Sequence, residues 1–163
     1  MIIFQYINRK AMKKQFTSIL FVLALFTITS CQPPAPKVSH YRSADTEKLN
    51  LPFSDAVQVG SMLYLSGQVG NLPGELKLAE GGIEAETRQV MENIKRVLEA
   101  NGSSFDHVLK MTVFIDDIAQ WGDFNQVYVQ YFDKELPARS ALGADGLALG
   151  AAVEVECIAY IPN

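Results

Sequence analysis

Apolar residues recur with two periods along the chain, about 2 residues in some stretches and about 3.6 in others, which predicts a domain of strands and helices. Residues 56–59 (AVQV) and 62–66 (MLYLS) are strand-like runs on either side of Gly60-Ser61, a turn typical of a β-hairpin. Residues 108–115 (VLKMTVFI) are β-branched and apolar and predict a further strand. Its buried side is expected to carry Leu109, Met111, Val113 and Ile115.

Two other stretches have the helical period. Between residues 83 and 101 the apolar residues fall on one face and the charged residues on the other, and Asn101-Gly102 is expected to end this helix. Its apolar face consists of Val90, Met91, Ile94, Val97 and Leu98. A second helix is predicted after Asp116-Asp117, a candidate N-cap. Its apolar face consists of Trp121, Phe124, Val127, Tyr128 and Tyr131.

The last two predicted strands carry the most concentrated polar chemistry. Arg139 enters a short strand, and a glycine-rich connection over residues 143–150 leads to a final strand in which Glu154 and Glu156 point to the same face. We expect these two strands to pair as a C-terminal hairpin. A guanidinium can hold an anion, and a glutamate can move a proton or position a water. Alternating acids usually mark a solvated outer face, and without Arg139 that interpretation would be favoured.

The predicted order is strand, strand, helix, strand, helix, strand, strand. Right-handed crossovers would place both helices on one face of the sheet. The other face would then carry Ile158 and Tyr160 beside the two glutamates, and a half-apolar face without a helix indicates an oligomerisation surface. Cys157 alternates with these residues and is interpreted as a small buried hydrophobic side chain rather than a nucleophile.

Residues 1–31 have the layout of a lipoprotein-type signal peptide. Lys13-Lys14 precede an apolar run over residues 19–28, which is about half the ~20 residues that a membrane-spanning helix needs. The ending over residues 28–31 resembles the lipobox of bacterial lipoproteins, in which the cysteine, here Cys31, is acylated and becomes the first mature residue. The alternative is an ordinary secretory signal followed by an unrelated cysteine. Met12 is an alternative start to Met1.

The protein is therefore expected to be exported and held in the periplasm or at the outer membrane as a membrane-anchored lipoprotein, with the lipid as its only membrane contact. Residues 32–48 are rich in proline and polar residues and predict an extended tether, so that the folded domain would span residues 49–163. His40 lies in this tether, and nothing pairs with His107 at metal-ligand spacing, so no metal site is expected.

Charge bears on the class of partner. Without residues 1–30, which contain four basic residues and no acid, the chain has 10 basic and 18 acidic residues, a net charge of −8 instead of −4. Such an acidic domain is a poor match for a phosphate backbone, which disfavours nucleic acid as a partner. Apolar residues make up 48% and charged residues 20% of the chain, which are ordinary values for a globular protein.

Several motifs over residues 50–161 resemble one known family. These are the predicted hairpin with Ser66-Gly67-Gln68, the helix with Glu-Thr-Arg-Gln, the strand that ends in Asp116-Asp117, Pro137-Ala138-Arg139-Ser140 and Val153-Glu154-Val155-Glu156. Together they are similar to the RidA (YjgF/YER057c) family of enamine/imine deaminases. The resemblance implies a chorismate-mutase-like α+β fold, with a mixed β-sheet and two helices packed on one face. It also implies a homotrimer whose sheets form a central barrel with three clefts between subunits.

The resemblance also implies roles for individual residues. Arg139 would bind the substrate carboxylate, and Glu154 would position the attacking water. Gly67 would line the cleft with its main chain, and Asn125 would reach it from a helix. Two further positions line the family's cleft and differ here from many members. They are Phe53, where a tyrosine is usual, and Ala141, where a cysteine is common.

The implied reaction is hydrolytic deamination of a reactive 2-enamino or 2-imino acid to a 2-keto acid and ammonia, with no cofactor. Its partners would be the small 2-imino or 2-keto acid and two further copies of the chain. The alternative is a non-catalytic protein on the same trimeric scaffold, which binds small carboxylates or acts as a surface interaction protein.

Overall fold

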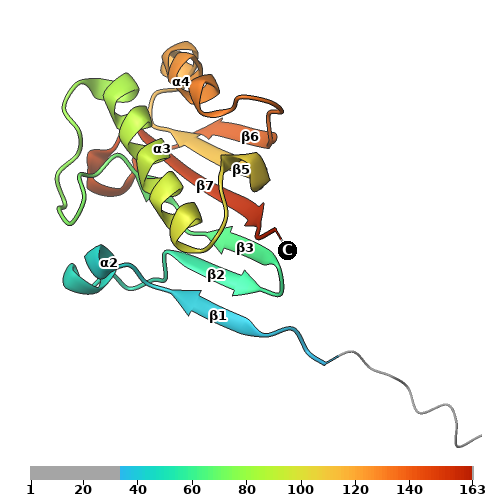
Figure 1. Cartoon of the computed structure of the whole chain (residues 1–163). Helices are drawn as coiled ribbons and strands as arrows, with labels where there is room; N and C mark the ends of the chain where they lie inside the picture. The colour runs from blue at the N-terminus through green and yellow to red at the C-terminus, as the bar shows by residue number, and fades with distance from the viewer. Residues whose placement is uncertain (1–33, 163) are drawn as a thin grey trace, which may run out of the picture. The chain divides into compact units, whose positions relative to one another are not determined.

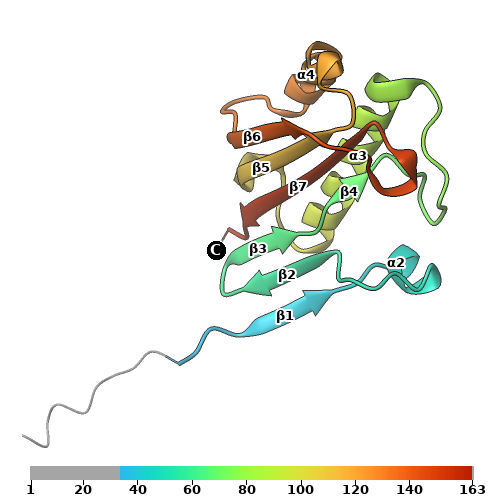
Figure 2. The same ribbon diagram turned by 180° about the vertical axis from the view of Figure 1, so that it is seen from behind.

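One mixed sheet organises the domain, and helices cover only one of its faces (Figures 1 and 2). The computed structural model describes residues 34–162, and this part contains seven strands. They are β1 (Val38–Tyr41), β2 (Ala56–Val59), β3 (Met62–Leu65), β4 (Gln68–Val69), β5 (Val108–Ile115), β6 (Ala138–Gly143) and β7 (Val153–Tyr160). The order in the sheet is β1-β2-β3-β7-β5-β6, and β4 also pairs with β7. Only the β5–β6 pair is parallel among these strands.

Two of the helices match the sequence predictions. They are α3 (Gly82–Ala100) and α4 (Trp121–Tyr128), and a shorter helix, α2 (Ala44–Lys48), comes before β2. Single 3₁₀ turns form at Phe105–His107, Ile118–Gln120, Val129–Tyr131 and Ala148–Gly150. Asn101 is the C-cap of α3 and Gly102 follows with a positive φ of 74°, as predicted for the end of this helix. None of the described helices has the length and apolar character needed to span a bilayer.

The core lies between the sheet and α3 with α4. From the helices it contains Val90, Met91, Ile94, Val97, Leu98, Phe124 and Tyr128, and from the strands Leu63, Met111, Val113, Ile115, Val153, Val155 and Cys157. A fully buried side chain of this kind contributes about 1.5–3 kcal/mol. Cys157 is buried, as predicted. Burial raises the pKa of its thiol to about 12, which disfavours the thiolate form that a nucleophilic cysteine needs.

One predicted core position is wrong. Leu109 is 46% exposed, although it alternates with Met111 and Val113 in the sequence. An irregularity in the pairing of β5 with β7, between Val108 and Lys110, changes the direction of the side chains there. Val108 is buried in its place, because the bulge inserts one residue into the strict alternation.

The predicted tether over residues 32–48 also differs from the structure. Residues 38–41 form β1, which pairs antiparallel with β2, and α2 follows directly. Strand β1 is held by main-chain pairing at the sheet edge and buries little of its own surface, so it has no hydrophobic pattern that would have revealed it. Within residues 34–162, regular structure therefore begins at Val38, before the predicted start of the domain at Leu49.

The predicted C-terminal hairpin is wrong as well, because β6 and β7 are not neighbours. Strand β6 lies parallel to β5, to which α4 connects it, whereas β7 lies on the other side of β5 and runs antiparallel to it. A helix between two strands allows parallel pairing, and this crossover determines the position of β6. Strand β5 therefore separates Arg139 from Glu154.

Candidate functional site

The carboxylate of Glu154 lies directly against the main chain of Gly67. Strand β4 follows Gly67 and pairs with β7, with Val69 opposite Glu154. A Cβ atom at position 67 would overlap Oε1 of Glu154 and would lie 2.9 Å from its Cδ atom. Only glycine leaves room for the carboxylate in this position. The sequence reasoning singled out both residues, and the structure brings them together.

Glu154 is set up to hold a proton more readily than a free glutamate. Burial raises the pKa of Glu154, and the negative charge of Glu156 on the same strand raises it further. A carboxyl group whose pKa lies nearer to neutrality can both accept and return a proton, which is the property of a general base.

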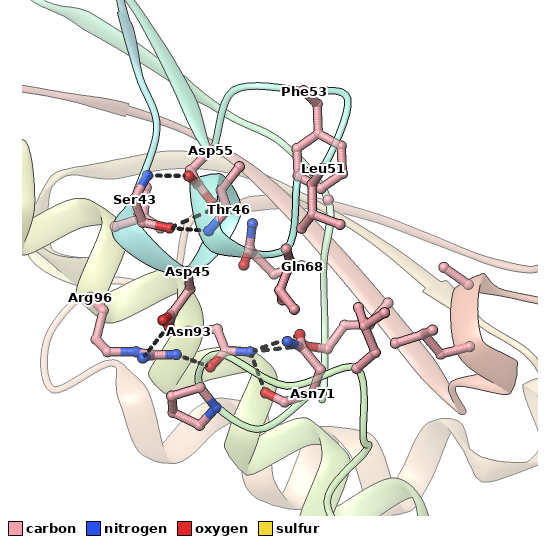
Figure 3. A pocket seen from close by; sticks show the side chains of 18 of the residues that line it. Ser43, Asp45, Thr46, Leu51, Phe53, Asp55, Gln68, Asn71, Asn93 and Arg96 are labelled. Carbon is pink, nitrogen blue, oxygen red and sulfur yellow. Dashed lines mark hydrogen bonds and ion pairs between the residues drawn. The ribbon is translucent and has the colours of Figure 1, made fainter.

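Glu154, Gly67 and Phe53 line one pocket with a volume of about 460 Å³. Its wall also includes Leu51, Gln68 and Leu149. Figure 3 shows Phe53 and Leu51 on one side of this pocket and Asp45, Asn93 and Arg96 on the other. The pocket is large enough for a small organic acid, and it joins an acidic group to an apolar surface.

Helix α2 forms a wall of this pocket through a buried hydrogen-bond network. Asp55, which is 5% exposed, accepts hydrogen bonds from the main-chain N–H of Ser43 at 2.7 Å and from Oγ1 of Thr46 at 2.7 Å (Figure 3). The side chain of Ser43 also caps α2 by accepting from the N–H of Thr46. The sequence reasoning missed this wall because it assigned residues 43–48 to a tether.

Arg139 lies in a different environment, against the inner side of α4. Its Nη1 donates a hydrogen bond to Oδ1 of Asn125 at 2.8 Å. Its guanidinium carbon lies 4.8 Å from the ring centre of Tyr128, 5.3 Å from that of Trp121 and 5.8 Å from that of Phe124. We call these three residues the ring cluster. Within residues 34–162, no carboxylate forms an ion pair with Arg139.

Arg139 and Glu154 point to opposite faces of the sheet. Arg139 stands opposite the buried Met111, so its side chain is on the helix-covered face. Glu154 alternates with the buried Val153 and Val155, so its side chain is on the uncovered face. Arg139 does not line the pocket that contains Glu154. One chain alone therefore does not bring the two groups together.

The predicted site residues thus form two groups. Phe53, Gly67 and Glu154 share the pocket, whereas Asn125 and Arg139 are hydrogen-bonded on the other face, where Ala141 stands opposite the buried Val113. Cys31 lies outside the described residues. Within residues 34–162, no three His, Cys, Asp or Glu side chains are placed to hold a metal ion.

The sequence reasoning missed the ring cluster as part of the site. It assigned Trp121, Phe124 and Tyr128 to a core stripe, and the latter two are indeed buried. These three aromatic residues recur on one face of the helix that also carries Asn125. This pattern could have predicted that a cationic side chain packs against their rings.

A sequence profile described as endoribonuclease L-PSP matches residues 46–161 of this chain. The chain belongs to this family. Among proteins similar to this chain, the mouse protein named 2-iminobutanoate/2-iminopropanoate deaminase is 42% identical over 108 residues, which are 66% of this chain and 80% of the mouse protein. The Arabidopsis thaliana protein named Reactive Intermediate Deaminase A, chloroplastic, is 33% identical over 148 residues, or 85% of this chain and 79% of the relative.

Solved structures of the endoribonuclease L-PSP family have the same fold. A Yersinia pestis protein of the Rid family, described as a protein of unknown function, matches with a TM-score of 0.72 and 36% sequence identity. The match covers 77% of this chain and 100% of the Yersinia chain. The predicted membership in the RidA (YjgF) family and the predicted α+β fold with two helices on one face of a mixed sheet are therefore confirmed.

Proposed function

We propose that this protein hydrolyses 2-imino acids, formed from reactive 2-enamino acids, to 2-keto acids and ammonia. The observation that carries this proposal is a pair of half-sites. In one, Glu154 lies against the main chain of Gly67 and has a raised pKa. In the other, Arg139 carries a positive charge that no described acid neutralises. Relatives with 33% and 42% identity bear deaminase names, which supports the same reaction class here.

Arg139 binds the carboxylate of the substrate in this proposal. One of its N–H groups is used by Asn125, and the remaining donors can form two parallel hydrogen bonds to a carboxylate. The ionised Glu154 takes a proton from a water molecule as the water oxygen bonds to the imine carbon, and it passes this proton to the imine nitrogen, which gives a carbinolamine. The remaining hydroxyl proton then moves to the nitrogen as the C–N bond breaks, which forms the C=O of the 2-keto acid and releases ammonia.

Two copies of the chain are needed to complete this site. Because Arg139 and Glu154 are on opposite sheet faces, Arg139 of one copy must meet Glu154 of the next. Figure 2 shows the sheet from the side that no helix covers. We define this uncovered face by Tyr64, Thr112, Phe114, Glu154, Glu156, Ile158 and Tyr160, and its apolar members offer surface for such packing. We propose that three copies pack through it as a homotrimer, with one site at each of the three boundaries.

The direct test is the loss of an imino acid made in situ by an amino acid oxidase, with the full-length protein present and semicarbazide as the trap for unreacted imine. We expect less trapped imine with the wild type than in buffer, and no such effect with Arg139→Ala. Arg88→Ala is the matched control, because the Arg88 side chain is exposed and its one hydrogen bond within the described residues is to Gln130. Equal trapping in buffer and with the wild type would exclude the reaction.

The shared site has its own test. Arg139→Ala and Glu154→Gln are each expected to be inactive when assembled alone. Random reassembly of a 1:1 mixture of the two variants should restore about a quarter of the sites. In these sites one copy supplies an intact arginine and its neighbour supplies an intact glutamate. An inactive mixture, with trimers confirmed by light scattering, would contradict a site made from two copies.

A non-catalytic carboxylate-binding role is the second candidate. Phe53 favours it, because the pocket wall there has no hydroxyl group. In that case the full-length protein would bind a 2-imino or 2-keto acid at Arg139 without changing the rate of imine loss. Calorimetry together with the trapping assay separates the two functions.

Export and lipid anchoring at Cys31 form a further part of the proposal, supported by the order of basic, apolar and small residues in the first 31 positions. Cell fractionation tests it. The wild type is expected in the membrane fraction, and Cys31→Ala is expected to lose acylation and membrane retention. Equal fractionation of both forms would contradict the anchor.

A further inference from the structure

The ring cluster surrounds the guanidinium of Arg139 with aromatic surface. Trp121, Phe124 and Tyr128 recur every three or four residues on α4, and all three ring centres lie within 6 Å of the guanidinium carbon. Asn125, on the same helix, holds Nη1 of Arg139 at 2.8 Å. Four contacts from one helix thus fix the direction of a single side chain on β6.

These contacts fix the guanidinium without neutralising it. An aspartate or glutamate in the same place would form an ion pair and compete with any incoming anion. Aromatic faces and an amide oxygen attract the cation but carry no net charge, so Arg139 keeps its full positive charge and its remaining N–H donors. Such a surrounding suits an arginine that must receive an external carboxylate.

The hydroxyl group of Tyr128 has no part in holding Arg139. It is buried and has no hydrogen-bond partner in the described part of the chain, whereas the ring of the same residue is the nearest of the three to the guanidinium. Burial raises the pKa of Tyr128 to about 12, so the phenol is neutral at physiological pH. The ring is therefore the part of Tyr128 that acts on Arg139.

We infer that Trp121 and Tyr128 are positioning residues, which hold the Arg139 guanidinium in the orientation that accepts the carboxylate of a small 2-keto or 2-imino acid. This inference rests on the proposed function only for the identity of the ligand. Phe124 takes part in the same cluster, but its side chain is wholly buried and serves the core as well.

The test is calorimetric binding of 2-oxobutanoate to the full-length protein. Trp121→Leu and Tyr128→Leu are each expected to weaken binding about two- to fivefold, the range for one cation–π contact, and Trp121→Phe and Tyr128→Phe to stay near the wild type. Phe105→Leu is the matched control, since Phe105 packs on Tyr131 and Phe132 in the same region without touching Arg139. In the deaminase assay, the leucine variants should raise KM and leave kcat nearly unchanged.

Asn125→Asp tests the charge argument independently. The aspartate keeps the size of the asparagine but pairs with Arg139, so 2-oxobutanoate should bind at least about tenfold more weakly than to the wild type. Asn125→Ala, which adds no charge, should weaken binding less than Asn125→Asp.

Three results would overturn the inference: no binding of 2-oxobutanoate by the wild type, wild-type affinity in both Trp121→Leu and Tyr128→Leu, or the same weakening in Phe105→Leu. If Tyr128→Leu does not fold, Trp121→Leu against Trp121→Phe decides the question. A wild type that binds 2-oxobutanoate but does not speed imine loss would overturn the deaminase function and leave the positioning role of the ring cluster intact.

Discussion

At the scale of single residues, the placement of Glu154 depends on the absence of a side chain at position 67. We predict that Gly67→Ala displaces the carboxylate and lowers kcat/KM at least about 100-fold, the usual effect of losing a general base. Steady-state kinetics measures the loss of kcat/KM, and thermal unfolding shows whether the variant is still folded. Gly122→Ala is the control, because a methyl group there meets no atom within 4 Å. Equal activity in the two variants would contradict this role of Gly67.

The pKa of Glu154 makes a prediction about pH. A general base must be ionised, so kcat/KM should fall as the pH drops through the raised pKa of Glu154. Glu156→Gln removes the neighbouring negative charge, which favours the ionised form of Glu154 and lowers its pKa. The acidic limb of the pH profile should therefore move to lower pH in Glu156→Gln. A limb that does not move, or moves to higher pH, would exclude Glu154 as the titrating group.

The candidate residues could be named from the sequence, but their surroundings could not. Arg139 and Glu154 belong to short motifs that can be compared with a family, and Gly67 is a glycine at the end of a strand. The partners of Arg139 come from α4, whose aromatic residues fit a core stripe as well as they fit a cluster around a cation.

At the scale of elements, the polar network around α2 holds a wall of the pocket. Asp55→Ala removes the acceptor for Ser43 and Thr46 and leaves the buried hydroxyl of Thr46 with one partner fewer. We predict that the free energy of unfolding falls by about 2–3 kcal/mol, measured by urea denaturation. Asp106→Ala removes a carboxylate from an exposed ion pair with Lys134 and should lower the free energy of unfolding by only about 0.5 kcal/mol. Similar losses in both variants would contradict a special role for Asp55.

The elements with a strong internal pattern could be predicted from the sequence. The errors concern features that depend on which strands pair with each other. Helix α3 and the buried side of β7 follow from periodicity. The β2–β3 hairpin follows from two strand-like runs on either side of the Gly60-Ser61 turn. The partner of β6 does not, because nothing in its residues distinguishes a parallel neighbour across α4 from an antiparallel hairpin. Strand β1 is held by main-chain bonds, and the bulge at Leu109 breaks an alternation that the sequence continues.

At the scale of the whole molecule, the uncovered face has to be buried for the proposed site to exist. Tyr64 is 45% exposed on this face and stands opposite Ile158. We predict that Tyr64→Glu, which places like charges near each other in a symmetric assembly, converts the proposed trimer to monomers and abolishes activity. Sedimentation measures the oligomeric state, and the trapping assay measures the activity. Leu109→Glu, an equally exposed position on the bulge of β5, is the control and should remain trimeric. An active Tyr64→Glu monomer would refute the shared site.

The separation of Arg139 and Glu154 by one intervening strand has a consequence for how the activity responds to dilution. A site built within one chain keeps its specific activity at any protein concentration. In the proposed site each turnover needs two chains in contact, so specific activity should decline once the protein is diluted below the dissociation constant of the assembly. A high substrate concentration should delay that decline by bridging the subunits.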